Sequence, residues 1–325
     1  MSVKSDISIR RLDSSTVPAV CELYRSIYGE DFPIPWVYDP VELEKREEDG
    51  RQATLLAFKD DRIVGQVAAV RSPWNPKLFE LTGLLVLPRF RGLGIGGMLA
   101  SNLMSQLLPE LGWVARYTES TTAHDISQRV DLKMGHRHCA LALNLLPPST
   151  YRHDDIFIAS GRVSCVMGFA EKEDDASAVY LPSRYAEVLK ELAEGFSRDF
   201  VEDDGAPEGK SSFEVSAFPV AGTAYGAALS LGEGFGADLK KELAPYDSFP
   251  ATMLQLPLVK GIDRAVEEAF AQGFRLGGFL PRWFENSDGL LLQRTGLPRW
   301  DEIKAVTPRG QRLLGIVRKD RETLL

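Results

Sequence analysis

Cysteine and histidine are scarce in this chain, and their spacing excludes two kinds of site. The three cysteines, Cys21, Cys139 and Cys165, are odd in number and show no C-x-x-C spacing. We therefore expect buried, reduced thiols in a cytoplasmic protein rather than a disulfide framework. His136 and His138 form an H-x-H pair, but no carboxylate or cysteine stands at ligand spacing from them. We therefore predict no metal site and no metal cofactor.

An excess of positive charge and a long apolar run are also missing. The 38 Lys and Arg against 46 Asp and Glu give a formal net charge of −8. This balance argues against a nucleic-acid partner, because nonspecific binding to phosphates needs a positive face. No apolar run approaches membrane-spanning length, and the first residues lack the apolar segment of a signal peptide. No membrane partner is expected, and the length of 325 residues favours two domains.

The most informative feature is a glycine cluster between an apolar run at 81–87 and a helical pattern at 96–108. A strand that turns through glycines into a helix leaves the first N–H groups of the helix without acceptors inside it. Those groups and the helix dipole favour an anion, and glycines let a phosphate approach closely. The segment therefore predicts a ligand that carries a pyrophosphate.

Two known phosphate motifs fit this segment less well. A Walker A loop needs Lys followed by Ser or Thr after its last glycine, whereas Gly97, Met98 and Leu99 follow here. The dinucleotide fingerprint G-x-G-x-x-G is formally satisfied at 92–97, and Glu119 stands roughly where a ribose-binding acid belongs. However, residues 88–91 separate the strand from the first glycine. An NAD-binding protein remains an alternative.

The flanking patterns predict an order of elements. Alternation, helical spacing and turn residues indicate strands at 7–12, 53–58, 63–70, 81–87, 114–118, 139–145 and 163–169, with helices at 16–28, 39–50, 96–108 and 126–134. Three strands in succession before the glycine loop are not expected of a doubly wound dinucleotide fold.

Arg91, Gly94 and Gly96 form R-x-x-G-x-G, preceded by V-x-P-x-x-R from Val86. This pattern resembles the acetyl-CoA loop of the GNAT (Gcn5-related N-acetyltransferase) superfamily. The predicted element order is also similar to that of GNAT proteins. The resemblance implies an α/β (α+β) fold with a mixed, mostly antiparallel central sheet flanked by helices.

A second domain is expected at 173–325, after a GNAT domain at 1–172. Patterns predict helices at 180–196, 235–243 and 262–271, and strands at 213–218, 224–231, 253–258, 276–280 and 290–292. The last part repeats the end of the first domain, which indicates an internal duplication and hence two GNAT-like domains. The glycines Gly232, Gly234 and Gly236 have no matching arginine or strand–helix register, so we predict a flexible connector there. The second domain would then lack a CoA loop.

Three further segments resemble acyltransferase modules associated with anti-sigma-factor-type ATP-binding domains. They are 121–128, 180–185, and 278–281 with 288–293. No kinase-like ATP-binding segment accompanies them. This narrower resemblance does not supply an acceptor substrate.

The GNAT resemblance implies acetyl-CoA as cosubstrate and assigns residues to it. Pantetheine would pair with the backbone of Leu84, Leu85 and Val86. The pyrophosphate would bind at Arg91, Gly92, Leu93, Gly94, Ile95 and Gly96.

The same resemblance directs attention to the catalytic groups. Glu80 is the preferred base, and Glu119, at the end of the next strand, is the second choice. Strand alternation would put Glu80, Thr82, Leu84 and Val86 on one face unless a bulge intervenes. The tyrosine that commonly protonates the leaving sulfur is replaced by Asp131, which we expect to be a solvated helix residue. His124 and Ser127, expected on one helix side at i and i+3, are the substitutes.

The function predicted is therefore N-acyl transfer, most simply N-acetyl transfer, to an amine of a small molecule or peptide. The alternative is an acyl-CoA-binding sensor without turnover, whose second domain contacts a partner protein.

Overall fold

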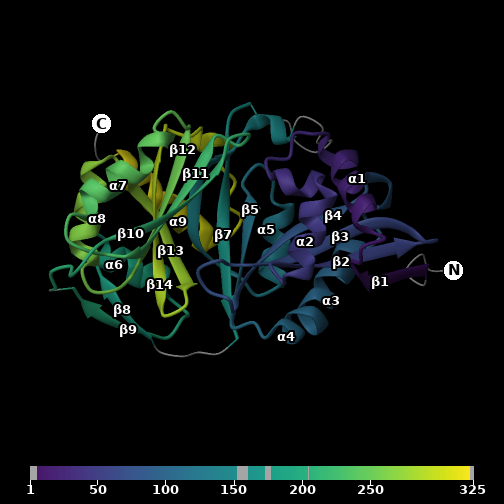
Figure 1. Ribbon diagram of the computed structural model, residues 1–325, viewed down its shortest axis with the longest axis horizontal. Helices are drawn as coiled ribbons and strands as arrows, with labels where there is room; N and C mark the ends of the chain where they lie inside the picture. Colours follow the sequence, from purple (N-terminus) through teal and green to yellow (C-terminus); the bar gives the residue numbers. More distant parts are fainter. Residues whose placement is uncertain (1–5, 152–159, 173–176, 204, 323–325) are drawn as a thin grey trace. The chain divides into compact units, whose positions relative to one another are not determined.

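The computed structural model describes residues 6–151, 160–172, 177–203 and 205–322 (Figure 1). The chain divides into two compact units, Met1–Glu119 with Pro148–Ser160, and Ser120–Pro147 with Gly161–Leu325. The domain boundary expected at 172/173 falls beside residues 173–176, which lie outside the described residues. Residues Ser120–Pro147 group with the second unit, in which strand β6 (Arg137–Leu146) pairs with β13 (Arg275–Phe284). The expected boundary therefore stays a prediction.

The first unit is built on a mixed sheet. Its strands, in spatial order, are β1 (Ile7–Arg11), β2 (Gln52–Lys59), β3 (Arg62–Arg71), β4 (Leu78–Val86) and β5 (Ala115–Thr121). Neighbours are antiparallel except β4 and β5, which are parallel. The helices are α1 (Val17–Tyr28), α2 (Pro40–Glu48), α3 (Ile95–Asn102) and α4 (Leu108–Leu111), and a π-helical segment, Leu103–Leu107, joins the last two. The element order predicted from the sequence is confirmed.

Local sequence explains two of the boundaries. Asp60 and Asp61 join β2 to β3 with φ angles of 49° and 58°, the left-handed pair of a tight hairpin turn. The Asp39 carboxylate accepts hydrogen bonds from the N–H groups of Val41 and Glu42 and so caps α2. Thr16 precedes α1 as predicted, but its hydroxyl bonds to Asp13 instead of capping the helix.

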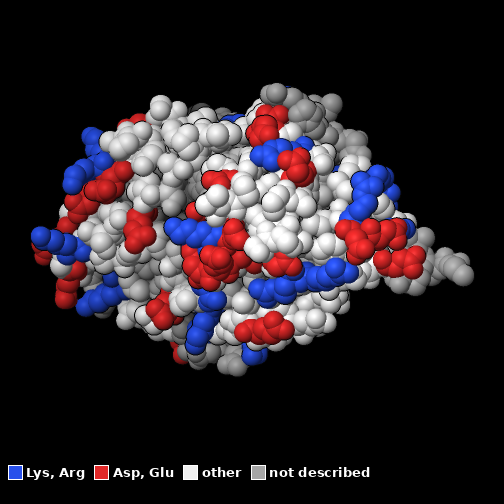
Figure 2. Space-filling view, turned by 45° about the vertical axis from the view of Figure 1, so that its right-hand side comes forward, with Lys and Arg blue, Asp and Glu red and all other residues white. Residues whose placement is uncertain are grey.

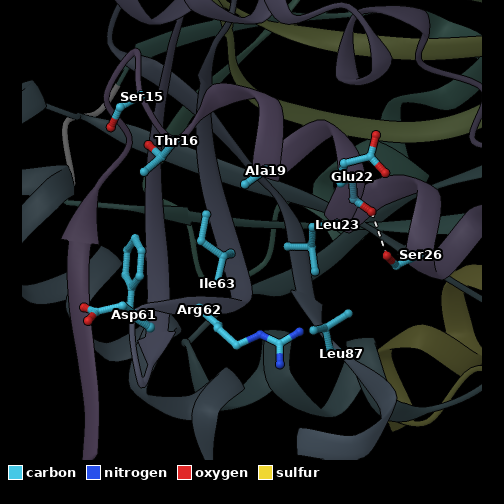
Figure 3. Close-up of a pocket in the computed structure, with 11 residues that line it drawn as sticks. Ser15, Thr16, Ala19, Glu22, Leu23, Ser26, Asp61, Arg62, Ile63 and Leu87 are labelled. Atoms are coloured by element: carbon cyan, nitrogen blue, oxygen red, sulfur yellow. Dashed lines mark hydrogen bonds between the residues drawn. The ribbon is translucent and has the colours of Figure 1, made fainter.

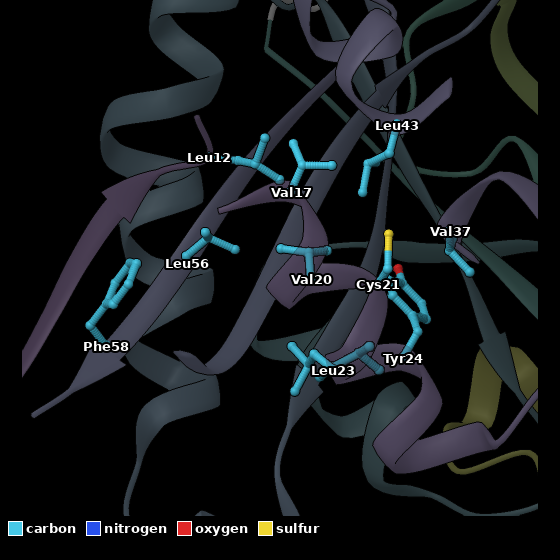
Figure 4. Packing of buried hydrophobic residues seen from close by; sticks show 11 residues of the cluster. Leu12, Val17, Val20, Cys21, Leu23, Tyr24, Val37, Leu43, Leu56 and Phe58 are labelled. Carbon is cyan, nitrogen blue, oxygen red and sulfur yellow. The ribbon is translucent and has the colours of Figure 1, made fainter. Parts of the chain in front are cut away.

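The core of the first unit lies between α1 and one face of the sheet (Figure 4). Val20 and Leu23 of α1 pack in one cluster with Leu56, Phe58 and Leu85 of the sheet. Leu56 is completely buried, and burying one leucine side chain is worth about 1.5–3 kcal/mol. This packing holds α1 against the face of the sheet to which Leu85 of β4, the strand that carries Glu80, contributes.

The second unit contains another mixed sheet. Its spatial order is β7 (Val163–Glu171), β6, β13, β14 (Ser287–Thr295), β12 (Ala251–Pro257), β11 (Thr223–Ser230) and β10 (Ser212–Phe218). Its helices are α5 (Ile126–Lys133), α6 (Ala186–Leu192), α7 (Phe235–Leu243), α8 (Ile262–Ala271) and α9 (Pro308–Glu322). A small parallel pair, β8 (Ser177–Leu181) and β9 (Arg198–Glu202), accompanies them.

The strand pairings repeat. The parallel pair β4–β5 has its counterpart in β11–β12, and the antiparallel pair β6–β7 in β13–β14. The antiparallel pair β3–β4 likewise matches β10–β11. A helix follows the parallel strand in both halves, α5 after β5 and α8 after β12. The predicted fold of two GNAT-like domains is confirmed by this repetition.

Two expectations for the second half were wrong or incomplete. The helix predicted at 180–196 is shorter, Ala186–Leu192, because Pro182 disfavours helical geometry in the residue before it and Leu181 instead ends strand β8. Helix α9 was not predicted from the sequence. No helix among the described residues is long and apolar enough to cross a membrane. On the face shown in Figure 2, acidic and basic side chains are interspersed.

Candidate active site

Strands β4 and β5 separate in the middle of the first unit. Their parallel pairing runs from Leu78 and Ala115 to Glu80 and Tyr117. β4 continues to Val86 and β5 to Thr121, and no further pair joins these two fully described strands. The free edge of β4 can hydrogen-bond an extended ligand in place of a strand.

A β-bulge lies on this free part of β4. The strand register changes between the pairs Ala68↔Thr82 and Gln66↔Leu85. Gly83, with φ of 60°, and Leu84 together oppose a single residue of β3. The bulge puts Leu85, which packs in the α1 core, on the face of Glu80 and Thr82. The bulge that would break the expected alternation is thus present, and Leu84 and Val86 do not share that face because the extra residue reverses the alternation.

The glycine loop follows β4 after a short connection. A short 3-10 turn at 88–90 leads to Arg91, whose Nε donates to the Val86 carbonyl at 3.3 Å. Gly94 is left-handed, with φ of 83°, and precedes α3 as its N-cap. No side chain caps α3, and its first internal bond runs from Met98 N–H to the Gly94 carbonyl.

The N–H groups of residues 95–97 thus have no acceptor inside the helix. A Cβ atom at Gly97 would meet nothing within 4 Å, and one at Gly96 only Val86 at 3.9 Å. Packing therefore does not require glycine at either position. The open surface and uncapped N–H groups suit an approaching phosphate. The other predicted loop residues, Gly92, Leu93 and Ile95, lie in the same segment.

Two half-buried carboxylates lie beside the point where the strands part. The Tyr117 hydroxyl donates to Glu80 Oε2 at 3.5 Å. Burial raises the pKa of Glu80, against hydrogen bonds from Thr82 and Tyr117 and the charge of Arg46. Burial and the neighbouring Glu80 raise the pKa of Glu119 to about 8. The structure therefore brings both predicted bases together, and the pKa of each lies above its ordinary value.

Sequence reasoning missed a tyrosine at the bulge. The Tyr24 hydroxyl lies against Gly83, where a Cβ atom would come within 2.7 Å of it. Gln66 Nε2 donates to that hydroxyl at 2.8 Å and to the Gly83 carbonyl at 3.3 Å. In the sequence Tyr24 appears only as an apolar position of α1. No local signal connects it to a glycine 59 positions later, and only the packing of α1 on β4 does so.

The predicted acid candidates lie in the second unit, around α5. His124 precedes the helix, which begins at Ile126, so the expected i, i+3 relation on one helix does not hold. Asp131 was expected in solvent but is 2% exposed, and the Ser120 hydroxyl donates to its Oδ2 at 2.7 Å. The prediction was wrong because Asp131 packs towards β5. The Ser127 hydroxyl is buried.

The second glycine cluster is not a flexible connector. β11 turns through Gly232 and Gly234 into α7, and Gly234 is its left-handed N-cap with φ of 77°. The strand–helix register of the first loop is thus present. However, the Gly236 N–H donates to Glu268 Oε2 at 2.5 Å, and the Gly232 N–H donates to Ser211 Oγ at 3.1 Å. A carboxylate of the chain itself occupies the helix N-terminus where the first loop is open.

Motif residues near 288–293 have structural roles. Asp288 accepts from Arg198 Nε at 2.5 Å and from the Arg282 N–H at 2.7 Å. Gln293 accepts from the Leu143 N–H at 2.8 Å. These buried groups hold strands together and show no free surface for a ligand. Among the described residues, no group of three or more His, Cys, Asp or Glu side chains could hold a metal ion.

The first unit also has an open hollow of about 480 Å³ between α1 and the β2–β3 hairpin (Figure 3). Its floor includes Leu23, Ile63 and Leu87, and its rim includes Glu22 and Arg62. None of the predicted site residues lines it. It is therefore separate from the candidate active site.

A parallel strand pair that parts beside an open, glycine-rich helix N-terminus suits an extended ligand with an anionic end. Residues 17–135 match the acetyltransferase (GNAT) family. The chain therefore carries a GNAT acetyltransferase domain there, and this match assigns residues 17–135 to the N-acetyltransferase class of enzymes. The narrower resemblance to modules associated with anti-sigma-factor-type domains stays a prediction.

Solved structures similar to this chain have low sequence identity to it. An N-acetyltransferase from Staphylococcus aureus Mu50 shares 14% identity at a TM-score of 0.42, covering 51% of this chain and 99% of its own. The ribosomal-protein-S18-alanine N-acetyltransferase from Escherichia coli shares 14% at 0.40, covering 51% and 93%. An N-acetyltransferase from Thermoplasma acidophilum in complex with coenzyme A shares 15% at 0.38, covering 51% and 98%. No curated protein matches the chain.

Proposed function

We propose that the protein is an acyl-CoA-dependent N-acyltransferase that moves an acetyl group from acetyl-CoA to an amine by direct attack. The observation that carries the proposal is the free edge of β4, which begins after Glu80 and ends at the open glycine loop. An extended thioester cosubstrate needs such an edge for its amide groups and such a loop for its pyrophosphate.

The predicted cosubstrate contacts follow from this arrangement. The backbone of 84–86 would pair with pantetheine, and the N–H groups of the Arg91–Gly96 loop would hold the pyrophosphate. The Arg91 guanidinium adds positive charge beside the loop.

Glu80 would act as the base. Its carboxylate takes the proton that the amine loses on attack, and burial, by raising the pKa of Glu80, makes it a stronger base than an exposed glutamate. Glu119 shares the same charge environment, so the two carboxylates titrate together. The acceptor we propose is an amine of a small molecule or peptide, which an ionised Glu80 would attract in its cationic form.

The proton donor to the sulfur remains a prediction at His124 and Ser127. Asp131, at the usual tyrosine position, is already hydrogen-bonded to Ser120. The presence of Asp131 in place of the usual tyrosine also favours the second candidate function, an acyl-CoA sensor without turnover. A cytoplasmic location belongs to the proposal, supported by the three free and buried cysteines.

A ligand screen tests the proposal at its first step. Acetyl-CoA, longer acyl-CoAs, free CoA, NAD and ATP are compared by thermal shift, and CoA compounds should raise the unfolding midpoint. Stabilisation by NAD but not by CoA would show that the dinucleotide alternative is right. An amine screen with a free-thiol readout then separates enzyme from sensor. Amine-dependent CoA release that is lost in Glu80→Gln is expected of the enzyme.

A further inference from the structure

The Tyr24 hydroxyl lies at the part of β4 where the strand has left its neighbour and bulges. Its oxygen is so close to Gly83 that only glycine fits, since a Cβ atom would stand 2.7 Å from it. Tyr24 itself is 5% exposed and packs in a ring cluster with Tyr28 and Phe32. The ring centroids of Tyr28 and Phe32 lie 6.4 and 5.3 Å from the ring centroid of Tyr24. The hydroxyl is therefore fixed against the bulge by packing on both sides.

The direction of its hydrogen follows from Gln66. The Gly83 carbonyl can only accept, so the Gln66 atom that lies 3.3 Å from it must be the amide nitrogen. The same nitrogen lies 2.8 Å from the Tyr24 oxygen and donates to it. The Tyr24 oxygen is thus an acceptor from Gln66, and its own hydrogen makes no hydrogen bond to an acceptor among the described residues. A buried hydroxyl with a hydrogen to give is a ready donor to a ligand.

The surroundings keep this hydroxyl neutral. Burial raises the pKa of Tyr24, and the nearby charge of Glu80 raises it further. Tyr24 therefore acts as a hydrogen-bond donor and does not lose its proton near neutral pH. Gln66 faces Leu85 across the sheet and lies on the same face as Val70, the partner of Glu80. Donor and base consequently share one face of the sheet.

We propose that Tyr24 donates a hydrogen bond to the carbonyl oxygen of the acyl group and stabilises the negative charge that develops there during transfer. This inference rests on the proposed function. In the step, the amine nitrogen forms a bond to the carbonyl carbon, the carbon–sulfur bond breaks, and its electron pair stays on sulfur. The proton lost by the amine passes to Glu80 and in the net reaction ends on the sulfur. Tyr24 keeps its proton throughout.

The first test needs no knowledge of the acceptor. Acetyl-CoA labelled with ¹³C at the carbonyl is bound to wild type, Tyr24→Phe and Tyr28→Phe, and its carbonyl band is measured by isotope-edited infrared spectroscopy. A hydrogen bond lowers the carbonyl frequency, so the Tyr24→Phe complex should lose part of the shift seen in wild type. Tyr28→Phe is the matched control, from the same helix and ring cluster, and should keep the shift.

The outcomes distinguish this inference from the proposed function. If labelled acetyl-CoA does not bind wild type, the proposed function fails. If it binds but the band is the same in wild type and Tyr24→Phe, only the role of Tyr24 fails. With an amine found in the screen, Tyr24→Phe should lower kcat about 100-fold and leave KM for the amine and CoA affinity unchanged. An unchanged kcat would overturn the inference, and a thermal melt confirms that the variant is folded.

Discussion

Gly96 offers the sharpest test of the glycine loop, because the structure separates the effect of charge from the effect of folding. It lies in the first turn of α3 with helical backbone geometry, and a Cβ atom there would make only an ordinary contact with Val86 at 3.9 Å. Ala, Gln and Glu therefore all fit. Each should stabilise the helix by up to about 1 kcal/mol relative to glycine. Gly94 is less suitable, since a side chain at its φ of 83° costs about 1–2 kcal/mol.

The expected effect on binding comes from the charge of Gly96→Glu. Its carboxylate would stand among the N–H groups that the pyrophosphate needs. At a separation on the order of 5 Å and an effective dielectric constant of about 20, repulsion between two unit charges is about 3 kcal/mol. Affinity for CoA should therefore fall at least about 100-fold. Neutral Gly96→Gln has nearly the same size and reports the effect of bulk alone.

Isothermal titration calorimetry with CoA on wild type, Gly96→Ala, Gly96→Gln and Gly96→Glu measures these differences. We expect Ala to bind like wild type, Gln somewhat more weakly and Glu far more weakly. Thermal melts should show all three variants at least as stable as wild type. If Gly96→Glu binds CoA as well as Gly96→Gln does, the pyrophosphate does not bind at this helix end and the loop has been misinterpreted.

Three further predictions follow from the site. Calorimetry on the intact chain should give one CoA per chain, because Glu268 occupies the second helix end, and a stoichiometry near two would contradict this. Glu80→Gln should lower kcat by about 10²–10⁴ with CoA affinity unchanged, and a loss confined to CoA affinity would refute its role as base. The pKa of Glu119 rises from an ordinary 4.5 to about 8, so its contribution to stability is full below pH 4.5 and is lost as pH rises through 8. Glu119→Gln should therefore reduce the fall of the unfolding midpoint over that range, and an equal fall in both proteins would show that Glu119 is not buried as described.

The sequence by itself determined the elements and their order in the first half. Apolar spacing, Asp39 before α2, the pair Asp60 and Asp61, and the glycines after β4 act over a few residues. Such signals act between neighbouring residues, so they can be interpreted without knowing the tertiary contacts of the segment. The same is true of the R-x-x-G-x-G loop, whose function lies in the backbone of one continuous segment.

Tertiary structure alone decided which side chains meet. The bulge at Gly83 depends on pairing with β3, and it moved Leu85 to the face where alternation had placed Leu84. Asp131 is buried because Ser120 of β5 faces it. Both outcomes depend on strand register and on packing. A shift of the register by one residue turns every side chain of the strand to the opposite face of the sheet.

The two glycine loops show the same division between sequence and structure. Locally both are a strand, a left-handed glycine and a helix, at Gly94 and at Gly234. The two loops differ in the carboxylate of Glu268, which lies 32 residues after Gly236 in the chain. Packing of α7 against α8 brings this carboxylate to the N-terminus of α7. Tyr24 reaches the bulge in the same way, through packing of α1 on the sheet. The sequence specified where anion-binding geometry could form, and long-range packing decided which site stayed open, because only folding brings distant polar groups within hydrogen-bond distance.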